Sequence, residues 1–312
     1  MALQIAERFR SLVRGDFRIL AVTELLMKHH EYVPVEEIIR FSRLRDDEVR
    51  YRLRGLSRDR LIVSAPKTLP TGRGYLLTML GYDALALRVL VDRGKVEAVG
   101  KPLGVGKESD IYEALDGRGG RCVVKFHRLG RTSFRQTMKK RGYAAGRTHI
   151  SWLYQSRLSA EREYSALKTL HKVGVSVPRP IAYNRHAIVM GVIEGTELKF
   201  AEMEDPESIM LEIFRNVRVA YLRAGLVHSD LSEYNILVKA DGKVLIIDWP
   251  QSVSVDHPNA GENLRRDVCN IIDCFERKAR ISLGEDAALE YVTGKRRTLA
   301  GQSSILRPHL RP

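Results

Sequence analysis

The chain has 312 residues, 44% of them hydrophobic and 29% charged, a composition typical of a globular protein with a sizeable core and not of a disordered chain. At roughly 150 residues per domain, this length predicts two domains. The formal net charge of +14 favours a polyanionic partner. Nucleic acid ranks above an anionic membrane, because no basic amphipathic helix or lipidation motif accompanies the charge.

Cysteine usage and the N-terminal segment indicate the compartment. Cys122, Cys269 and Cys274 are an odd number without a CxxC pair, so we expect packing residues and neither a disulfide framework nor a zinc site. Residues 1–13 lack the features of a signal peptide, and no run of about 18 apolar residues occurs. We therefore expect a cytoplasmic protein without a membrane partner.

The first part of the chain has the pattern of a winged helix. Apolar residues recur at helical spacing, and Asp46, Asp47 and Glu48 suit a helix N-terminus. The predicted helices cover 17–30, 35–41, from Asp46 onward, and 79–90, with strands over 61–63 and 75–78. The helix that begins at Asp46 presents arginines on its outer faces. This domain is expected to span residues 1–92 and to bind nucleic acid.

From Val96 the pattern changes to short strands broken by glycines, followed by helices that alternate with strands. The fold class is therefore predicted to be α+β. The second domain is expected over 93–285, with an N-lobe over about 93–189 and a C-lobe over about 194–285. Residues 286–312 are expected to form a basic C-terminal tail.

The strongest chemical signal is the run HSDLSEYN at 228–235, followed by an aspartate at the end of the apolar run 244–247. Asp230 and Asn235 lie five residues apart, and Asp248 comes next, which is the order of the protein-kinase catalytic residues. Asp230 would orient the attacking hydroxyl or water. Asn235 and Asp248 would supply hard oxygen ligands to Mg²⁺, or to Mn²⁺. Ordinary loop carboxylates are the weaker alternative.

Residues that could bind ATP lie upstream of this run. The loop GVGKES could close over phosphates with its main-chain amides, although glycine-rich hairpins are common. Its residues are Gly104, Val105, Gly106, Lys107, Glu108 and Ser109. Lys125 ends an alternating strand and could reach the α- and β-phosphates; the alternative is an exposed strand lysine.

A glutamate partner for the lysine and a surface for adenine complete the expected nucleotide site. Glu163 is preferred over Glu161 as the partner of Lys125, because Tyr164 and Leu167 set the apolar face of the predicted helix over 159–170. The adenine is expected against the main chain near Met190, Val192 and Ile193. The alternative for this last segment is a buried strand without a ligand.

The runs GVGKESDIY, KFHRLGRTSF, LVHSDLSEYNIL and IIDWPQSV resemble the RIO family of atypical kinases, and the N-terminal winged helix is similar to that of its second subfamily. The resemblance implies an atypical serine/threonine protein kinase or ATPase that uses ATP and Mg²⁺. It also implies a role in maturation of the small ribosomal subunit, with the precursor particle and its rRNA as partners. In this subfamily the residue matching Asp248 is linked to a phosphoaspartate intermediate.

Three differences from the motifs of ordinary protein kinases make phosphorylation of peptide substrates doubtful. Ser229 replaces the usual arginine, Asp248-Trp249-Pro250 replaces Asp-Phe-Gly, and no Ala-Pro-Glu follows. We therefore expect a compact bilobal domain without the activation loop and peptide-binding helices. Two alternatives remain: a small-molecule phosphotransferase of the aminoglycoside-kinase type, and a DNA-binding regulator with a degenerate kinase lobe. The basic charge and winged helix disfavour the first, and the full set of catalytic residues disfavours the second.

Residues 117–160 stand out as a basic insert, with eleven Lys or Arg and no Asp or Glu. Aromatic residues are interleaved with the cations, a combination suited to phosphate contacts and base stacking. The cations include Arg131, Arg135, Lys139, Lys140 and Arg141. We expect RNA contact here, the alternative being a flexible basic loop. Thr132, Ser133 and Thr137 are candidate autophosphorylation sites.

Overall fold

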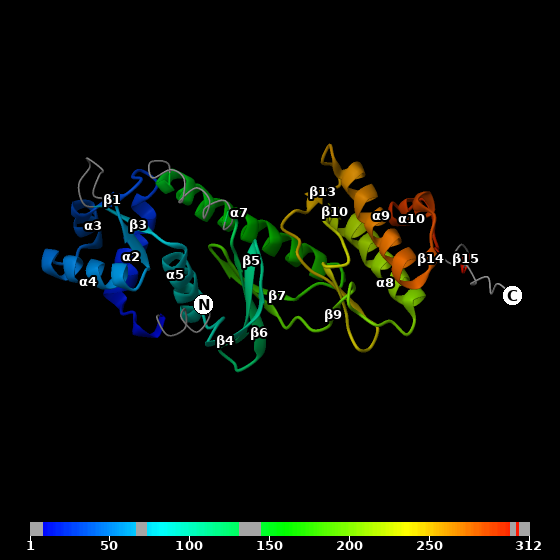
Figure 1. Cartoon of the computed structure of the whole chain (residues 1–312), viewed down its shortest axis with the longest axis horizontal. Coiled ribbons are helices and arrows are strands. Elements are labelled where there is room, and N and C mark those ends of the chain that lie inside the picture. The colour runs from blue at the N-terminus through cyan, green and yellow to red at the C-terminus, as the bar shows by residue number, and fades with distance from the viewer. Residues whose placement is uncertain (1–8, 67–73, 131–144, 300–303, 306–312) are drawn as a thin grey trace. The chain divides into compact units, whose positions relative to one another are not determined.

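The computed structural model describes residues 9–66, 74–130, 145–299 and 304–305 (Figure 1). The chain divides into two compact units. One comprises residues 1–161 with 181–190, and the other comprises 162–180 with 191–312.

The first unit begins with a winged helix. Three helices surround a short sheet of strand order β1-β3-β2, and a fourth helix follows. The elements are α2 (Arg14–Leu26), β1 (Val33–Pro34), α3 (Val35–Ser42), α4 (Asp46–Arg58), β2 (Ile62–Ser64), β3 (Gly74–Leu77) and α5 (Met79–Asp92). The predicted elements are all present. The first helix ends at Leu26, earlier than predicted, and strand β1 is too short for a periodicity argument to detect.

Helix α4 has the features that its sequence pattern predicts. Its acidic first turn favours the helix N-terminus, and Val49, Leu53 and Leu56 are buried at helical spacing. The arginines Arg50, Arg54 and Arg58 are exposed. The predicted basic outer surface is therefore present.

A five-stranded sheet forms the rest of the first unit. Its strands are β4 (Ala98–Val105), β5 (Ser109–Leu115), β6 (Arg121–His127), β7 (Pro180–Asn184) and β8 (Ala187–Gly191), in the order β4-β5-β6-β8-β7. Antiparallel pairing sets Lys125 of β6 opposite Ile111 of β5, and His127 opposite Ser109. This register places the end of β6 beside the loop between β4 and β5.

Helix α5 belongs to two hydrophobic cores. Tyr82 and Leu85 are buried with the winged-helix residues, whereas Leu87 and Leu90 are buried with Phe126 and other residues of the sheet. Because both faces of α5 are covered, the winged helix and the sheet form one compact body.

Helix α7 (Ala145–Lys172) begins well before the predicted start at Ser159. The proposal of one basic insert over 117–160 is therefore corrected, because this range includes strand β6 and the first part of α7. Leu153, Ser156 and Ser159 are buried at helical spacing, a pattern that the basic composition of the whole range 117–160 obscured in the sequence. The basic segment 131–144 lies outside the described residues, and so do Thr132, Ser133 and Thr137.

The second unit consists of helices and short antiparallel strands. Its helices are α8 (Pro206–Val219), the π-helix η1 (Ala220–Ala224), α9 (Ala260–Ala279) and α10 (Glu285–Val292). Its strands are β9 (Thr196–Glu197), β10 (Leu226–Val227), β11 (Ile236–Val238), β12 (Val244–Ile246), β13 (Val253–Ser254), β14 (Ile281–Ser282) and β15 (Ser304–Ile305). The α+β class is confirmed. The predicted start of the C-terminal tail at residue 286 is wrong, because helix α10 continues to Val292 and its Ala287, Ala288 and Val292 are buried. Among the described residues, no helix has the length and apolar character needed to cross a membrane.

Candidate active site

The loop between β10 and β11 in the second unit holds the predicted catalytic residue Asp230, which is exposed; we call residues 228–235 the catalytic loop for this predicted role. Asn235 donates from its side-chain amide to the main-chain oxygen of Asp230 at 2.8 Å. This bond leaves the Asn235 side-chain oxygen available as a ligand. Ser229, just before Asp230, has φ of 70°, a left-handed conformation that non-glycine residues rarely adopt.

Helix α9 holds this loop with polar side chains spaced along one face. The carboxylate of Asp267 accepts the main-chain N–H groups of Ser229 at 2.7 Å and of Leu231 at 2.9 Å. Arg266 and Asn270 donate to the carbonyl oxygens of the same two residues, at 2.6 Å and 2.9 Å respectively. These contacts offset the strained backbone and fix the position of the catalytic loop.

Sequence reasoning missed Asp267. A detectable signal was present, because Asn263, Asp267 and Asn270 recur at helical spacing on an amphipathic helix whose neighbouring apolar residues face the core. Burial raises the pKa of Asp267, while the two N–H groups that it accepts oppose that rise.

His228 connects the catalytic loop to the segment that carries Asp248. Its ring lies against the indole of Trp249, with ring centroids 4.5 Å apart. Burial lowers the pKa of His228, so the ring is neutral near pH 7. One tautomer fits both of its bonds: Nε2–H donates to the carbonyl of Ile247 at 3.0 Å, and Nδ1 accepts the main-chain N–H of Asp230 at 3.3 Å.

Asp248 follows strand β12 in a left-handed conformation, with φ of 66°. Two bonds support this turn: Trp249 is fully buried and donates from Nε1 to the Ile246 carbonyl at 3.2 Å, and the Ile247 N–H donates to the Asn235 carbonyl at 2.9 Å. The main chain of Asn235 is therefore bonded to the residue that immediately precedes Asp248. Trp249, which stands where ordinary protein kinases have the phenylalanine of Asp-Phe-Gly, therefore anchors the segment after β12 in the core.

The donor set fits Mg²⁺ bound together with phosphates. Mg²⁺ is typically held by one or two carboxylates and by phosphate oxygens, and Asn235 and Asp248 offer one amide and one carboxylate oxygen donor. Throughout the described ranges no group of three or more His, Cys, Asp or Glu residues could hold a metal alone. Nucleotide phosphates would therefore complete the coordination.

The predicted phosphate-binding loop lies in the first unit. The Gly106 N–H donates to the Ser109 carbonyl at 2.8 Å, which makes a tight turn between β4 and β5. Neither Gly104 nor Gly106 has a positive φ, and a Cβ on Gly104 would meet no atom within 4 Å. The fold itself does not require glycine at 104, so the open space suits close approach of a ligand. Val105, Lys107 and Glu108 are exposed in the same loop.

Lys125 is buried on β6, with 4% of its surface exposed. The exposed-lysine alternative is therefore wrong. Glu163 is also buried, at 1%, whereas Glu161 is exposed, which agrees with the preference for Glu163. The pairing of Lys125 with Glu163 stays a prediction.

The expected adenine-binding segment begins at the end of β8. Met190 is buried, while Val192 and Ile193 are partly exposed after the strand. Contact between adenine and this main chain stays a prediction.

Comparison with known families decides the identity of the chain. A model described as "Rio2, N-terminal" matches residues 9–93, and a model described as "RIO domain" matches residues 110–288. The chain belongs to the Rio2 family of RIO-type serine/threonine-protein kinases. The predicted resemblance and the kinase class are confirmed.

Two curated Rio2 relatives and one solved structure support this assignment. The Rio2 kinase of Methanocaldococcus jannaschii is 43% identical over 277 residues, covering 86% of this chain and 100% of the relative. That of Schizosaccharomyces pombe is 39% identical, covering 86% of this chain and 77% of the relative. A Chaetomium thermophilum Rio2 kinase structure, an ADP/Mg²⁺-phosphoaspartate complex, superposes with a TM-score of 0.80 at 36% identity, covering 92% of this chain and 89% of that chain.

Proposed function

We propose that this Rio2-family kinase works mainly as an ATPase in maturation of the small ribosomal subunit, in the cytoplasm. Its phosphoryl acceptors would be Asp248, a serine of its own chain, and water. The observation that carries the proposal is that Asp230 and Asn235 share the loop between β10 and β11, and that this loop is hydrogen-bonded to the segment that carries Asp248. These residue types suit phosphoryl transfer, and the sequence lacks the Ala-Pro-Glu motif of a peptide-binding platform.

Each residue of the proposed site has its own role in phosphoryl transfer. Asp230 would orient the acceptor, Lys125 would contact the phosphates, and Asn235 and Asp248 would hold the metal. A bound Mg²⁺ supplies charge neutralisation to the transferred phosphoryl group. In the covalent route, a carboxylate oxygen of Asp248 forms a bond to the γ-phosphorus while the bond to the β-phosphate oxygen breaks, releasing ADP. Water then hydrolyses the acyl phosphate.

The phosphoaspartate route can be tested directly. The related Chaetomium thermophilum structure contains a phosphoaspartate, which supports the same chemistry in this chain. Wild-type protein incubated with γ-labelled ATP and Mg²⁺ should acquire a label that hydroxylamine removes, because acyl phosphates react with this nucleophile. Asp248→Asn should acquire no such label. A label that resists hydroxylamine in both proteins would assign the acceptor to a hydroxyl group instead.

An RNA partner is supported by the surface of α4. Arg50, Tyr51, Arg54 and Arg58 share the exposed side of this helix, and Tyr51 is 70% exposed. Exposed guanidinium groups beside an aromatic ring suit phosphate contact and base stacking. Together with the net charge of +14, this stripe supports rRNA as the ligand of the winged helix.

The assembly role is tested by measuring ATP hydrolysis with and without precursor small subunits. The proposal predicts that the particle changes the hydrolysis rate at least several-fold, and that the triple variant Arg50→Ala, Arg54→Ala, Arg58→Ala loses this response while basal hydrolysis persists. A matched triple variant at exposed arginines of the second unit, Arg215, Arg223 and Arg297, should respond as the wild type does. A rate that the particle leaves unchanged would count against the assembly role.

The small-molecule phosphotransferase is not favoured, because the Rio2 similarity extends across both the winged helix and the kinase domain. A degenerate kinase lobe is not favoured either. Lys125, Glu163, Asp230, Asn235 and Asp248 are all present.

A further inference from the structure

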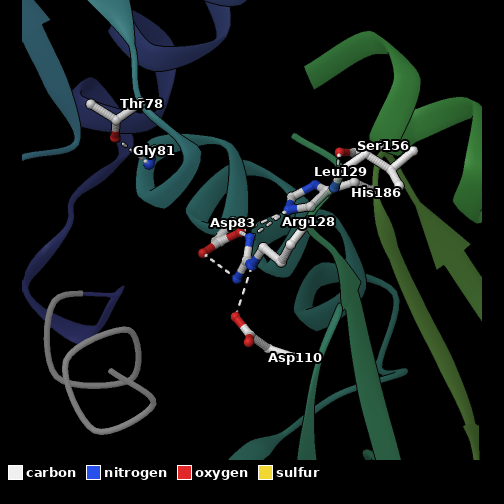
Figure 2. Close-up of polar contacts among 8 residues, drawn as sticks. All are labelled: Thr78, Gly81, Asp83, Asp110, Arg128, Leu129, Ser156 and His186. Carbon is white, nitrogen blue, oxygen red and sulfur yellow. Dashed lines mark hydrogen bonds and ion pairs between the residues drawn. The ribbon is translucent and has the colours of Figure 1, made fainter. Parts of the chain in front are cut away.

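A buried cluster of charged side chains lies within the first unit, where the winged helix meets the sheet (Figure 2). None of its residues belongs to the candidate active site described above. At the centre of the cluster is Arg128, with 4% of its side chain exposed. The guanidinium donates to Asp83 through Nη1 at 2.5 Å and through Nη2 at 2.9 Å. It also donates through Nε to Asp110 at 2.9 Å. Both carboxylates are buried.

The cluster joins three parts of the first unit. Asp83 belongs to α5 of the winged helix, Asp110 to β5, and Arg128 follows β6 directly. His186, in the turn between β7 and β8, lies 2.7 Å from Asp83 through Nε2. Its ring stacks on Tyr82, the neighbour of Asp83, at a centroid distance of 4.5 Å. The next contact in this turn is also with the winged helix: Arg185 binds Glu24 of α2 through Nε and Nη2, at 2.9 Å and 2.6 Å.

Such a cluster is an inefficient way to stabilise a domain interface. Burial removes water from a guanidinium and two carboxylates, and apolar residues of similar volume would often be equally stabilising. What the cluster adds is fixed geometry, because the planar guanidinium accepts only certain positions for its two carboxylate partners.

Arg128 also contacts the loop predicted to bind phosphates. The Arg128 N–H donates to the Glu108 carbonyl at 2.6 Å, so the main chain of Arg128 holds this loop at its turn. Its side chain holds Asp110, two residues further along. Arg128 thus contacts both ends of the segment 108–110 and lies three residues after Lys125.

Helix α7, which carries Glu163, is supported from the same side. Leu153 of α7 is buried in the core of the winged helix. Ser156 accepts the Leu129 N–H at 3.1 Å, and Ser159 shares a hydrogen bond with His127 at 3.0 Å. The first part of α7 is therefore tied both to the winged helix and to the chain that follows β6.

We propose that the winged helix is a structural part of the nucleotide site, with Asp83 and Arg128 as positioning residues for the groups that bind the phosphates of ATP. Asp83 holds the Arg128 side chain, and Arg128 holds the segment 108–110, which immediately precedes Ile111, the residue paired with Lys125 across the sheet. ATP binding and ligand binding to the winged helix are then energetically coupled. The inference rests on the proposed ATP-binding role of this loop.

The test compares ATP with adenosine, because only ATP has the phosphates that this loop would contact. Asp83→Asn removes the buried charge, and Arg128→Lys keeps the charge but loses the two-pronged geometry. Each should weaken ATP binding about 10-fold or more and leave adenosine binding unchanged within about two-fold. Asp92→Asn is the matched control, since Asp92 also lies on α5 and pairs with Arg88 at 2.9 Å, but on the exposed surface. Its ATP affinity should equal that of the wild type.

Thermal unfolding of each variant establishes that it is folded at the assay temperature. Equal losses for ATP and adenosine, or no loss in a folded variant, would overturn the proposal. Hydrogen exchange of the wild-type protein gives a second test that needs no substitution. ATP, but not adenosine, should slow amide exchange in α5; identical exchange with both ligands would also overturn it. These measurements contain no RNA, so failure of the ribosomal role would leave their outcome unaffected.

Discussion

Asp267 holds the main chain on both sides of Asp230, by accepting the N–H groups of Ser229 at 2.7 Å and Leu231 at 2.9 Å. Asp230, the proposed catalytic aspartate, is exposed, but the main-chain groups on either side of it are held by a buried carboxylate from α9. Because the main chain around Asp230 is held in place, its exposed carboxylate can keep the orientation that it needs toward the acceptor.

Asp267→Asn should lower kcat by about 10- to 100-fold with KM for ATP nearly unchanged, because the new amide accepts with only one oxygen and presents an NH₂ donor to the other N–H group. Steady-state kinetics over a range of ATP concentrations measure both quantities. Asp273→Asn, at an exposed position on the same helix, is the control and should behave as the wild type. An unchanged kcat in Asp267→Asn would show that the loop keeps its position without this carboxylate.

Asp230→Ala should reduce phosphoryl transfer by about 10²- to 10⁴-fold, the range typical for loss of a general base, with nucleotide affinity nearly unchanged. The carboxylate would contact the acceptor and not the nucleotide. Binding is measured by titration with a fluorescent ATP analogue, and transfer by single-turnover release of phosphate. A large loss of affinity without a loss of rate would contradict the role assigned to Asp230.

Acid should destabilise the protein through His186. Burial lowers its pKa to about 4, against the attraction of Asp83 and with help from the nearby Arg128 and His127. An unfolded imidazole has a pKa near 6.5, so the unfolded chain takes up the proton first as the pH falls. The contribution of this group is fully present above about pH 6.5 and is lost as the pH falls toward 4, by at most about 3 kcal/mol. Denaturant unfolding of His186→Gln should show a flatter pH dependence over this interval. A slope equal to that of the wild type would assign the acid sensitivity to other groups.

Helix periodicity was sufficient to predict the winged helix, and the order of the motifs was sufficient to predict the α+β kinase domain, because both signals are local in sequence. The roles of Asp230, Asn235 and Asp248 stay predictions. What the sequence could not predict depends on contacts between distant residues. Asp83 lies within the predicted helix over 79–90, and only the fold places it beside Arg128 and His186. The many basic residues of the range 117–160 likewise concealed the helical spacing of Leu153, Ser156 and Ser159. For this reason the sequence did not show that α7 begins well before Ser159.

Replacing Arg131, Arg135, Lys139, Lys140 and Arg141 with alanine should weaken binding to rRNA and flatten its salt dependence, while basal ATP hydrolysis persists. Each cation that no longer neutralises a phosphate removes roughly 0.7 to 0.9 from the slope of log affinity against log salt concentration. Filter binding at several salt concentrations measures the slope. An unchanged slope with intact hydrolysis would assign the RNA contact to the arginines of α4.

Magnesium-dependent ATP turnover by Asp248→Ala tests the central assignment most directly, because Asp248 is proposed both as metal ligand and as phosphoryl acceptor. Its carboxylate is partly exposed, whereas the neighbouring Trp249 supplies the buried anchor, so the variant should melt near the wild-type temperature. We predict that turnover falls to background at every Mg²⁺ concentration, with the fold intact. Wild-type turnover in a folded Asp248→Ala protein would contradict the account and remove this residue from the site.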